Sequence, residues 1–582
     1  MHKSILLSVS VAALAAVASA ANPPAVGLTA LGSMERILQH EAPFGTETVE
    51  ISAARNEVES FQVVVAAKGE SLRVTSVALP GLVGEKGAEI PAECIRLYRE
   101  ESVRVRMSSS RAELPPGLYP DALVPFVNPE TGKPIERYAR RKVDGKVSVS
   151  GHQMYAVPFE VFAGQNQPVW IDVRVPKGVP AGVYRGEVRV STDKGKATIP
   201  VALTVWGFDL PDGPTHCNHF GGFSGVAPFF GVKPGSDDFS RIEERYCDAL
   251  AEHRLNPPLP RRLLPTVNGD GSLSVDANRH AALRAFVEKL HVTDFPIPSS
   301  SFARPPRSVT NDVRKAISPD QRAKALRYYR DYYRYLKENG WADRAYVYLF
   351  DEPNSAVDYE HVQVLGEIVH EAVPELKCLV VEQTYPHDPS WPDIDPAVDI
   401  WCPLWGFIDR ETINRKLKQG DSVWSYTALA QRAPKYHPAY AEVGDKDPPY
   451  WHIDRPLISY RVPTWINRQY GITGLLYWST GGKHVPSPWH DPSFRMQFNG
   501  SGSLFYPGTP CGVPGPVASM RLKNIRDGME DYEYFALLER RAGAAAVRKI
   551  VDRIAPTWWG YTRDPKALSA ARGELAAAIL AR

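Results

Sequence analysis

The sequence predicts a multi-domain protein in which an antiparallel β-sandwich precedes a (β/α)8 barrel and a small helical region. Three observations lead there. The 582 residues are too many for one ordinary domain. Short alternating strands fill the first third, and strands alternate with helices from His216 onward. We expect a signal peptide over residues 1–20, a sandwich over 21–210, a barrel over 211–510 and helices over 511–582.

The amino-terminal segment has the features of a secretory signal peptide. Lys3 supplies the positive start, residues 5–17 are apolar, and Ala18-Ser19-Ala20 forms a small-residue cleavage site. This apolar stretch is too short to cross a bilayer, and no later stretch is long enough. We therefore expect no transmembrane segment and a mature protein that begins near Ala21, exported to the periplasm or the medium.

Composition excludes several classes of partner and cofactor. The 68 basic and 66 acidic side chains nearly cancel, which gives no electrostatic footprint for nucleic acid or an anionic membrane surface. The six cysteines include no Cys-x-x-Cys pair and no metal-ligand spacing, so we expect no metal or other cofactor. They are expected to be buried small hydrophobes, with one disulfide left open in an oxidising compartment.

The sandwich prediction depends on short, largely alternating segments separated by Gly, Pro and charged turns. Strands at this spacing, without helical periodicity between them, are typical of an antiparallel sandwich. The stretch GFDLPDGP is the expected linker. The predicted strands include VESFQVVVAA (Val58–Ala67), WIDVRVP (Trp170–Pro176), YRGEVRVST (Tyr184–Thr192) and ATIPVALTVW (Ala197–Trp206).

The barrel prediction depends on repeated strand–helix units. One helix has clear ends: Ser318-Pro319-Asp320-Gln321 combines an N-cap, Pro at N1 and a capping-box Gln, and Gly340 closes it. A doubly wound open sheet is the alternative, but no Gly-rich phosphate loop follows any strand. Other expected helices cover 239–253, 277–290 and 358–373, and expected strands are Tyr346–Phe350, Cys378–Tyr385, Val398–Trp405, Ser422–Ala428 and Gly471–Thr480.

The carboxyl-terminal region is expected to be a helical cap packed on the barrel. Its first helix, Ala518–Arg541, has Ile525, Met529 and Leu537 near helical spacing. The charged run from Arg521 to Asp531 is interpreted as a solvated helix face that also docks on the barrel.

The segment YVYLFDEPN, Tyr346–Asn354, is the strongest candidate for a functional site. A continuous apolar and aromatic run predicts a strand buried on both faces, and Pro353 ends it. Asp351 and Glu352 then lie at the carboxyl end of a parallel strand, where α/β proteins place their ligands. Two adjacent charges there are costly unless they are solvated, paired or used; a helix cap and a salt bridge are the structural alternative.

The predicted strand ends combine carboxylates with aromatic rings. There is no cluster of His ligands, no Gly-x-Ser-x-Gly segment and no phosphate loop. Carboxylates among aromatic rings at a barrel mouth indicate glycoside hydrolysis, which needs an acid for the leaving oxygen and a second group near the anomeric carbon. We expect a glycan substrate, bound by Tyr385, Trp478, Trp405, Tyr426 and His219, with Asp351 and Glu352 as catalytic residues.

The adjacency of Asp351 and Glu352 favours one version of this chemistry. Direct double displacement needs carboxylates about 5–5.5 Å apart that flank the scissile bond, and neighbours on one strand leave in different directions. A substrate with a 2-acetamido group supplies its own nucleophile, the amide oxygen. Glu352 would then be the acid/base and Asp351 would orient the amide N–H, while Tyr385 could hydrogen-bond the acetamido oxygen.

Five segments resemble glycoside hydrolase family 123, together with the wider group known as domain of unknown function 4091. They cover nearly the whole mature chain: ARNEVESFQVVV at Ala54, VPAGVYRGEVRV at Val179, YVYLFDEP at Tyr346, GLLYWST at Gly474 and RLKNIRDGMEDYEYFALLE at Arg521. The resemblance implies a β-N-acetylgalactosaminidase that acts by substrate-assisted retention. Its consecutive Asp-Glu pair corresponds to Asp351 and Glu352, and its acetamido-contacting tyrosine to Tyr385.

Two alternatives stay open. One is an ordinary retaining glycosidase in which Glu352 is the acid/base and a carboxylate from another strand, such as Glu382, is the nucleophile. The other is a secreted glycan-binding protein on a degenerate barrel. The configuration of the hexosamine, the aglycone, exo or endo action and the oligomeric state are also left open.

Overall fold

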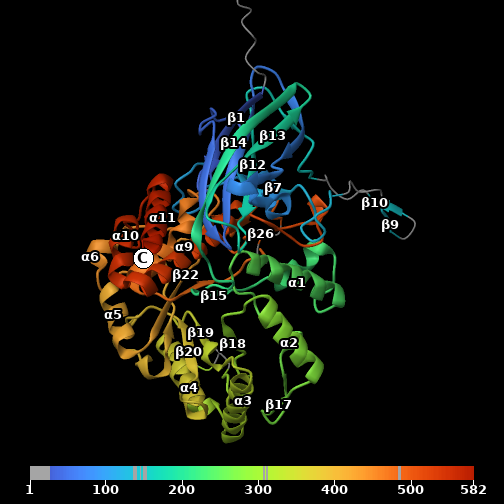
Figure 1. Ribbon diagram of the computed structural model, residues 1–582. Helices are drawn as coiled ribbons and strands as arrows, with labels where there is room; N and C mark the ends of the chain where they lie inside the picture. Colours follow the sequence, from blue (N-terminus) through green and yellow to red (C-terminus); the bar gives the residue numbers. More distant parts are fainter. Residues whose placement is uncertain are drawn as a thin grey trace, which may run out of the picture.

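The chain forms a sheet-rich amino-terminal region, a parallel-sheet region and a set of carboxyl-terminal helices that contacts both (Figure 1). The computed structural model describes residues 26–135, 141–143, 146–148, 154–305, 309, 312–482, 485 and 487–581. The predicted signal peptide lies outside these residues. Among the described helices, none is both long and apolar enough to cross a membrane.

Two sheets pack together in the amino-terminal region. Their shared core contains Val63 and Ile171 from the first sheet and Val188 and Leu203 from the second. The pairing is antiparallel as predicted, except that β2 runs parallel to β14. The first sheet has the order β1 (Val26–Gly32), β3 (Val58–Ala67), β12 (Asn166–Arg174), β7 (Ile95–Val105), β8 (Gly117–Pro125). The second has β11 (Phe159–Val161), β4 (Leu72–Ala78), β13 (Gly182–Thr192), β14 (Gly195–Asp209), β2 (Val49–Arg55), with β5 (Gly81–Val83) and β6 (Glu89–Pro91) at its side; β9 (Arg141–Val143) and β10 (Lys146–Ser148) pair separately.

A parallel sheet of seven strands carries the candidate catalytic residues. From β18 to β23 its order follows the sequence, and β15 then pairs beside β23, so the sheet winds in one direction. A doubly wound sheet would reverse its order in the middle. The strands are β15 (Cys217–Phe220), β18 (Phe295–Ile297), β19 (Ala345–Asp351), β20 (Lys377–Val381), β21 (Ile400–Trp401), β22 (Ser422–Thr427) and β23 (Gly474–Tyr477).

Side-chain contacts show that this sheet is strongly curled. β15 and β19 are five steps apart in the sheet order, which in a flat sheet would be roughly 24 Å. The Nδ1 atom of His219 on β15 nevertheless lies 3.0 Å from the hydroxyl of Tyr346 on β19. The ring of Tyr346 also packs 5.3 Å from that of Trp424 on β22. The sheet is therefore curled so strongly that side chains from distant strands meet on its inner face.

The two edges of the curled sheet are joined by polar side chains. No ladder pairs β15 with β18 in the described chain. The backbone N–H of Asn218 donates to the carboxylate of Asp294 (2.8 Å), and the backbone N–H of Asn256 donates to the side-chain oxygen of Asn218 (2.6 Å). The structure therefore supports the barrel prediction only in part: the described residues form a curled parallel sheet, and they do not pair into a closed ring of eight strands.

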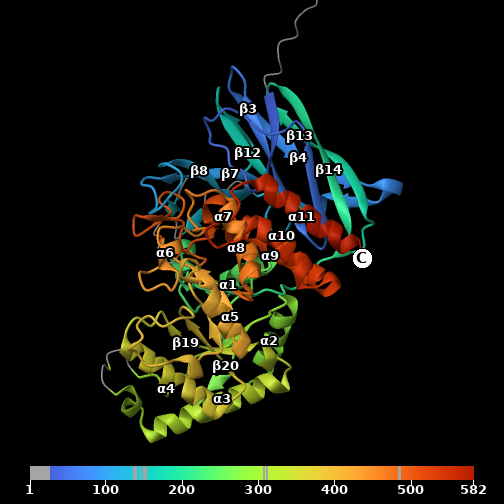
Figure 2. The same cartoon turned by 90° about the vertical axis from the view of Figure 1, so that its left-hand side faces the viewer.

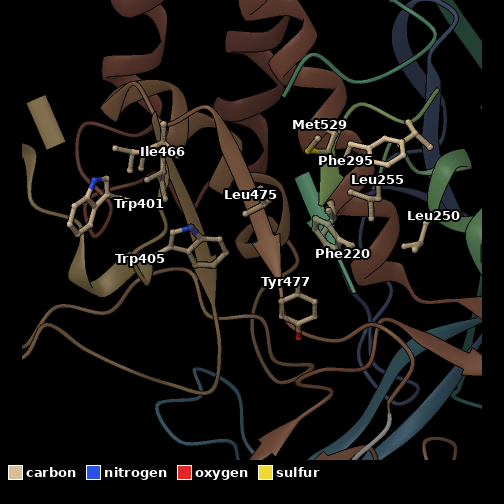
Figure 3. Close-up of a cluster of buried hydrophobic side chains, with 14 of the residues drawn as sticks. Phe220, Leu250, Leu255, Phe295, Trp401, Trp405, Ile466, Leu475, Tyr477 and Met529 are labelled. Carbon is tan, nitrogen blue, oxygen red and sulfur yellow. The ribbon is translucent and has the colours of Figure 1, made fainter. Parts of the chain in front are cut away.

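Helices cover the outer face of the curled sheet, and large apolar side chains fill the layer between them (Figure 3). The capping box predicted at Ser318 is confirmed, with Gln321 as its partner. The helices of this region are α1 (Asp237–Glu252), α2 (Ala277–Lys289), α3 (Pro319–Glu338), α4 (Ala356–Ala372), α5 (Arg410–Gln419), α6 (Tyr440–Val443), α7 (Ile458–Arg461) and α8 (Pro463–Tyr470); short strands are β16 (Thr266–Val267), β17 (Leu273–Ser274), β24 (Ser493–Phe494), β25 (Phe498–Asn499), β26 (Phe505–Pro507) and β27 (Pro516–Ala518).

The charged run at the start of α9 (Met520–Ala542) is buried, which contradicts the predicted solvated face. The helix lies between the amino-terminal sheets and the curled sheet, with α10 (Ala544–Ile554) and α11 (Pro565–Leu580) beside it (Figure 2). Every residue from Met520 to Asp531 is buried. Helical amphipathicity failed as a guide here because both sides of α9 face protein.

The buried charges of α9 are paired with residues from every part of the molecule. Arg521 binds Asp121 of β8 (3.0 Å), and Lys523 binds Asp172 of β12 (2.8 Å). Burial alone would raise the pKa of Asp172, but Lys523 and Arg526 hold it well below its ordinary range. These pairs fix the helix to the first sheet of the amino-terminal region.

The next turns of α9 bind neighbouring helices. Arg461 of α7 donates two hydrogen bonds of 2.8 Å to Asp531, and the indole of Trp465 donates a third of 2.9 Å to the same carboxylate. Arg572 of α11 lies 3.4 Å from Asp531 as well. Asp531 is fully buried, so its charge depends on these donors.

We expect Asp531→Asn to lower the free energy of unfolding by about 3–5 kcal/mol, because it leaves buried guanidinium groups without their counter-charge. The midpoint of urea unfolding measures this. The matched control is Asp238→Asn, whose partner Arg241 is exposed, and its effect should be about 0–1 kcal/mol. Equal midpoints for the two variants would contradict the role assigned to the buried network.

Candidate active site

Asp351 faces the interior of the curled sheet because β19 contains a β-bulge. Tyr348 pairs with Leu379 of β20, but the next pair is Phe350 with Val380, so β19 has one extra residue. Leu349 and Phe350 consequently both face the outer core, where the ring of Phe350 lies 6.0 Å from that of His361 on α4. Asp351 returns to the inner side, and its Oδ1 accepts a hydrogen bond of 2.9 Å from the hydroxyl of Tyr348.

Glu352 is turned toward the same side by a second irregularity. Its φ is 49°, in the left-handed region that a residue with a Cβ rarely adopts. The side-chain amide of Asn354 donates to its carbonyl oxygen at 2.7 Å. In this conformation Oε1 of Glu352 accepts a hydrogen bond of 2.6 Å from the hydroxyl of Tyr426 on β22. Asp351 and Glu352 are both exposed, so substrate can reach them.

A cavity of about 160 Å³ lies beside Glu352 at the carboxyl ends of β19, β20 and β22. This volume is several times the ~30 Å³ share of one liquid water molecule, so the cavity can hold a small group of a ligand. Its lining is Glu352, Asn354, Val381, Glu382, Gln383, Cys402, Leu404, Phe407, Gln431, Tyr426 and Tyr436.

Glu382 is a second carboxyl group in this cavity, in a different environment. It directly follows β20 and is 6% exposed. Burial, with the nearby charge of Glu352 in support, raises the pKa of Glu382 to about 8. The hydroxyl of Tyr359 on α4 donates to its Oε1 at 3.3 Å. This environment favours the protonated, neutral form of Glu382.

The other predicted site residues have different positions. Tyr426 lines the cavity as a direct partner of Glu352. Tyr385 is 5% exposed and does not line this cavity; its ring packs 6.2 Å from that of Tyr436. Trp478 follows β23, is half-buried, and its ring lies 5.4 Å from that of Phe494. His219 faces the inner side of the sheet against Tyr346, and burial lowers its pKa to about 4.

Trp405 corrects a prediction. The predicted strand through Trp405 stops at Trp401, and Trp405 lies in a short 3-10 helix. It is 1% exposed, and its indole donates to the hydroxyl of Ser425 at 3.1 Å. Figure 3 shows it among the buried core side chains, so it has no surface to offer a sugar ring.

Sequence reasoning missed part of the cavity wall. The predicted strand Cys378–Tyr385 ends at Val381 in the structure. Gln383 therefore belongs to the loop after the strand, and it lines the cavity. That position next to Glu382 could have been found by ending the strand earlier. Gln431 and Tyr436 come from the long connection after β22, where no sequence periodicity marks a role.

One cluster has the residue types of a metal site. Ligand atoms of His370, Cys378 and Asp399 lie within 4.8 Å of one another, at the opposite end of the strands from Glu352. Asp399 already accepts a hydrogen bond of 2.7 Å from the backbone N–H of Cys378 and lies 3.0 Å from Nε2 of His370. Burial raises the pKa of the Cys378 thiol well above its usual value, which disfavours the thiolate that a metal needs. The donor set fits an ion pair better than a metal.

None of the six cysteines, all of which lie in the described part of the chain, forms a disulfide. Four of them are buried, in agreement with the prediction of small core residues. Cys217 and Cys402 line the inner side of the curled sheet.

Carboxyl groups gathered at the carboxyl ends of a sheet wound in one direction, around a small cavity with phenol partners, are the arrangement of glycoside hydrolases. Comparison with protein families makes the assignment specific. Residues 313–538 match the glycoside hydrolase 123 catalytic domain, and residues 35–192 match the glycoside hydrolase 123 N-terminal domain. The chain belongs to glycoside hydrolase family 123.

One solved structure shares the fold of nearly the whole chain. A family 123 glycoside hydrolase from Clostridium perfringens, described for glycolipid glycan hydrolysis, is 13% identical, with 95% of this chain and 96% of that chain covered and a TM-score of 0.64. A β-glucuronidase from Parabacteroides merdae is 11% identical, covers 88% of this chain and 51% of its own, and has a TM-score of 0.26, too low to carry an argument. None of the curated proteins compared with the chain matches it.

We expect Tyr426→Phe to lower kcat/KM about 10–100-fold, because it removes the hydrogen bond to Glu352, and such bonds to charged groups contribute about 1.5–3 kcal/mol. Steady-state hydrolysis of an aryl glycoside across pH 4–9 measures the loss and any change in the pH profile. The control is Tyr184→Phe in the sandwich, whose hydroxyl bonds the carbonyl of Pro180. Tyr426→Phe with unchanged kcat/KM and pH profile would show that the contact has no catalytic role.

The raised pKa of Glu382 predicts a pH dependence of stability. An unfolded glutamate titrates near 4.5 and the folded group at about 8, so the folded state holds an extra proton between these values. Stability from this group is therefore present below pH 4.5 and is lost as pH rises to 8. Relative to wild type, the melting temperature of Glu382→Gln should rise by roughly several degrees between pH 5 and 9.

The control for this measurement is Glu411→Gln, an exposed position on α5. Its melting temperature should stay parallel to that of wild type over the same range. A Glu382→Gln curve that is equally parallel would show that Glu382 is ionised throughout.

Proposed function

We propose that this enzyme is exported and removes terminal β-linked N-acetylhexosamine, in particular N-acetylgalactosamine, from glycans by substrate-assisted retaining hydrolysis. One observation carries the proposal: two consecutive carboxylates, Asp351 and Glu352, are both exposed and both bond phenols from the inner side of the curled sheet. Each has its own phenol partner, Tyr348 and Tyr426 respectively. Separate partners suit two different roles better than one shared displacement.

In the proposed reaction, Glu352 donates its proton to the glycosidic oxygen as the bond to C1 breaks. The carbonyl oxygen of the substrate's 2-acetamido group attacks C1, and Asp351 accepts a hydrogen bond from the acetamido N–H as positive charge develops. Glu352, now a carboxylate, takes a proton from the water that opens the oxazolinium-like intermediate. Two attacks on C1 from opposite faces give retention of configuration.

The remaining predicted contacts fit around this scheme. Trp478 is half-buried and can present part of its ring as a floor for the sugar. Tyr385, the phenol predicted to contact the acetamido oxygen, packs 6.2 Å from Tyr436, which lines the cavity, and its buried hydroxyl bonds to none of the described residues. The Clostridium perfringens relative is described for glycolipid glycans, which makes glycolipids a reasonable source of the terminal sugar here. The predicted signal peptide supports action outside the cytoplasm.

The ordinary retaining mechanism needs Glu382 as an ionised nucleophile. Its burial and its pKa of about 8 oppose this, because a neutral carboxylic acid is a weak nucleophile. A glycan-binding protein without activity needs neither the accessible carboxylate of Glu352 nor the strained backbone that positions it. These observations favour the substrate-assisted enzyme.

We expect Glu352→Gln and Asp351→Asn each to reduce kcat by about 10²–10⁴-fold on an aryl β-N-acetylgalactosaminide. A leaving group that departs without protonation, such as dinitrophenol, should restore the first step in Glu352→Gln but not in Asp351→Asn. Stopped-flow release of the phenol separates these cases. Equal restoration in both variants would contradict the separate roles.

The substrate itself provides the second control. The matching aryl galactoside, with a hydroxyl in place of the acetamido group, should be hydrolysed at least about 10³-fold more slowly, since it lacks the internal nucleophile. Rapid hydrolysis of this galactoside would exclude substrate assistance. An aryl β-N-acetylglucosaminide tested beside it reports the preferred configuration.

A further inference from the structure

The loop that follows β20 holds polar atoms that the proposed reaction does not use. Glu382 and Gln383 are 6% and 4% exposed, and both line the cavity beside Glu352. The side-chain nitrogen of Gln383 donates to none of the described residues. A buried amide without a partner is unfavourable, so a cavity that retains one is suited to a ligand that accepts its hydrogen bond.

Glu382 adds a carboxyl group whose orientation is fixed by hydrogen bonds. One of its oxygens accepts the hydroxyl proton of Tyr359, whose own oxygen accepts the backbone N–H of His387 (3.3 Å). This chain fixes the orientation of the carboxyl group relative to α4. Glu382 lines the same cavity as Gln383, and in the protonated form that burial favours, its O–H is a hydrogen-bond donor.

We propose that Glu382 and Gln383 are specificity-determining residues that bind a ring hydroxyl group of the terminal sugar in the cavity beside Glu352. The proposal rests on the proposed function, because it names the part of the same substrate that the catalytic pair does not touch. A hydroxyl oxygen accepts from the Gln383 amide and from the Glu382 O–H, and its own proton can be donated to a neighbouring carbonyl or carboxyl oxygen.

The size and charge of the cavity favour this ligand group over others. About 160 Å³ admits a small group of a ligand. The walls away from the carboxyl groups are apolar or uncharged, including Phe407, Leu404 and Tyr436, with no cationic side chain among the lining residues that the structure describes. A sulfate or carboxylate substituent would find no counter-charge there, whereas a hydroxyl satisfies the buried donors.

The test combines substitutions with deoxy substrates. The variants are Gln383→Leu, Gln383→Met, Glu382→Gln and Glu382→Leu, and the substrates are the aryl β-N-acetylhexosaminide and its 3-, 4- and 6-deoxy analogues. Gln363→Leu on α4, whose amide bonds the carbonyl of Asp393, is the matched control. Values of kcat/KM are measured for every combination, and melting temperatures report folding.

We expect Gln383→Leu to lower kcat/KM about 10–100-fold on the parent sugar and to have little effect on the one deoxy analogue that lacks the recognised hydroxyl. Gln383→Met keeps the length of the side chain without a donor and should show the same pattern if Gln383→Leu folds poorly. Glu382→Gln keeps a donor and should retain activity within about tenfold, while Glu382→Leu should lose it in the same substrate-dependent way.

Two results would overturn the proposal. Equal losses on all four substrates would show a structural role without hydroxyl recognition. Abolition of turnover by Glu382→Gln, with recovery in azide, would make Glu382 a nucleophile. Failure of the proposed function is seen separately, as rapid hydrolysis of the aryl galactoside; the same deoxy series prepared on that galactoside then still reports whether Gln383 and Glu382 bind a hydroxyl.

Discussion

The buried charge network of α9 holds the molecule together. The helix places Arg521, Lys523 and Asp531 in a layer with protein on every side, and each finds a partner in a different element: β8, β12 and α7. Ion pairs without water contribute less net stability than apolar packing of similar volume, but they tolerate few alternative arrangements because an unpaired buried charge is so costly. The network therefore fixes the position of the amino-terminal sheets relative to the curled sheet more strictly than an apolar interface would.

The site itself depends on a local constraint of the backbone. Strand alternation would send neighbouring side chains to opposite faces of a sheet. The extra residue in β19 and the positive φ of Glu352 cancel that alternation over two residues, so Asp351 and Glu352 face the same side. Such strain persists only where the surrounding structure over-determines it, and the contacts of Tyr426 and Asn354 with Glu352 supply that support.

The sequence predicted the elements with strong local signals. The capping box at Ser318, the strand before Asp351 and the alternation of strands and helices all have short-range physical causes. The burial of the charged face of α9 could not be predicted this way, because it depends on partners 350–400 residues away, such as Asp121 and Asp172. The bulge in β19 was equally hidden, since register is set by pairing with β20. Trp405 was misplaced because β21 ends after two residues, and Gln431 and Tyr436 reach the site from a loop without periodicity.

The contrast between Glu352 and Glu382 follows mainly from their different burial. Both are glutamates at the ends of adjacent strands and share one cavity. Glu352 is exposed and can exchange protons with solvent and substrate, as an acid that becomes a base must. Glu382 is buried beside it, so a second negative charge is opposed by both desolvation and repulsion, and the proton stays on Glu382. In the proposed reaction the two carboxyl groups therefore have different roles: the exposed Glu352 transfers a proton, and the buried Glu382 donates a hydrogen bond to the substrate.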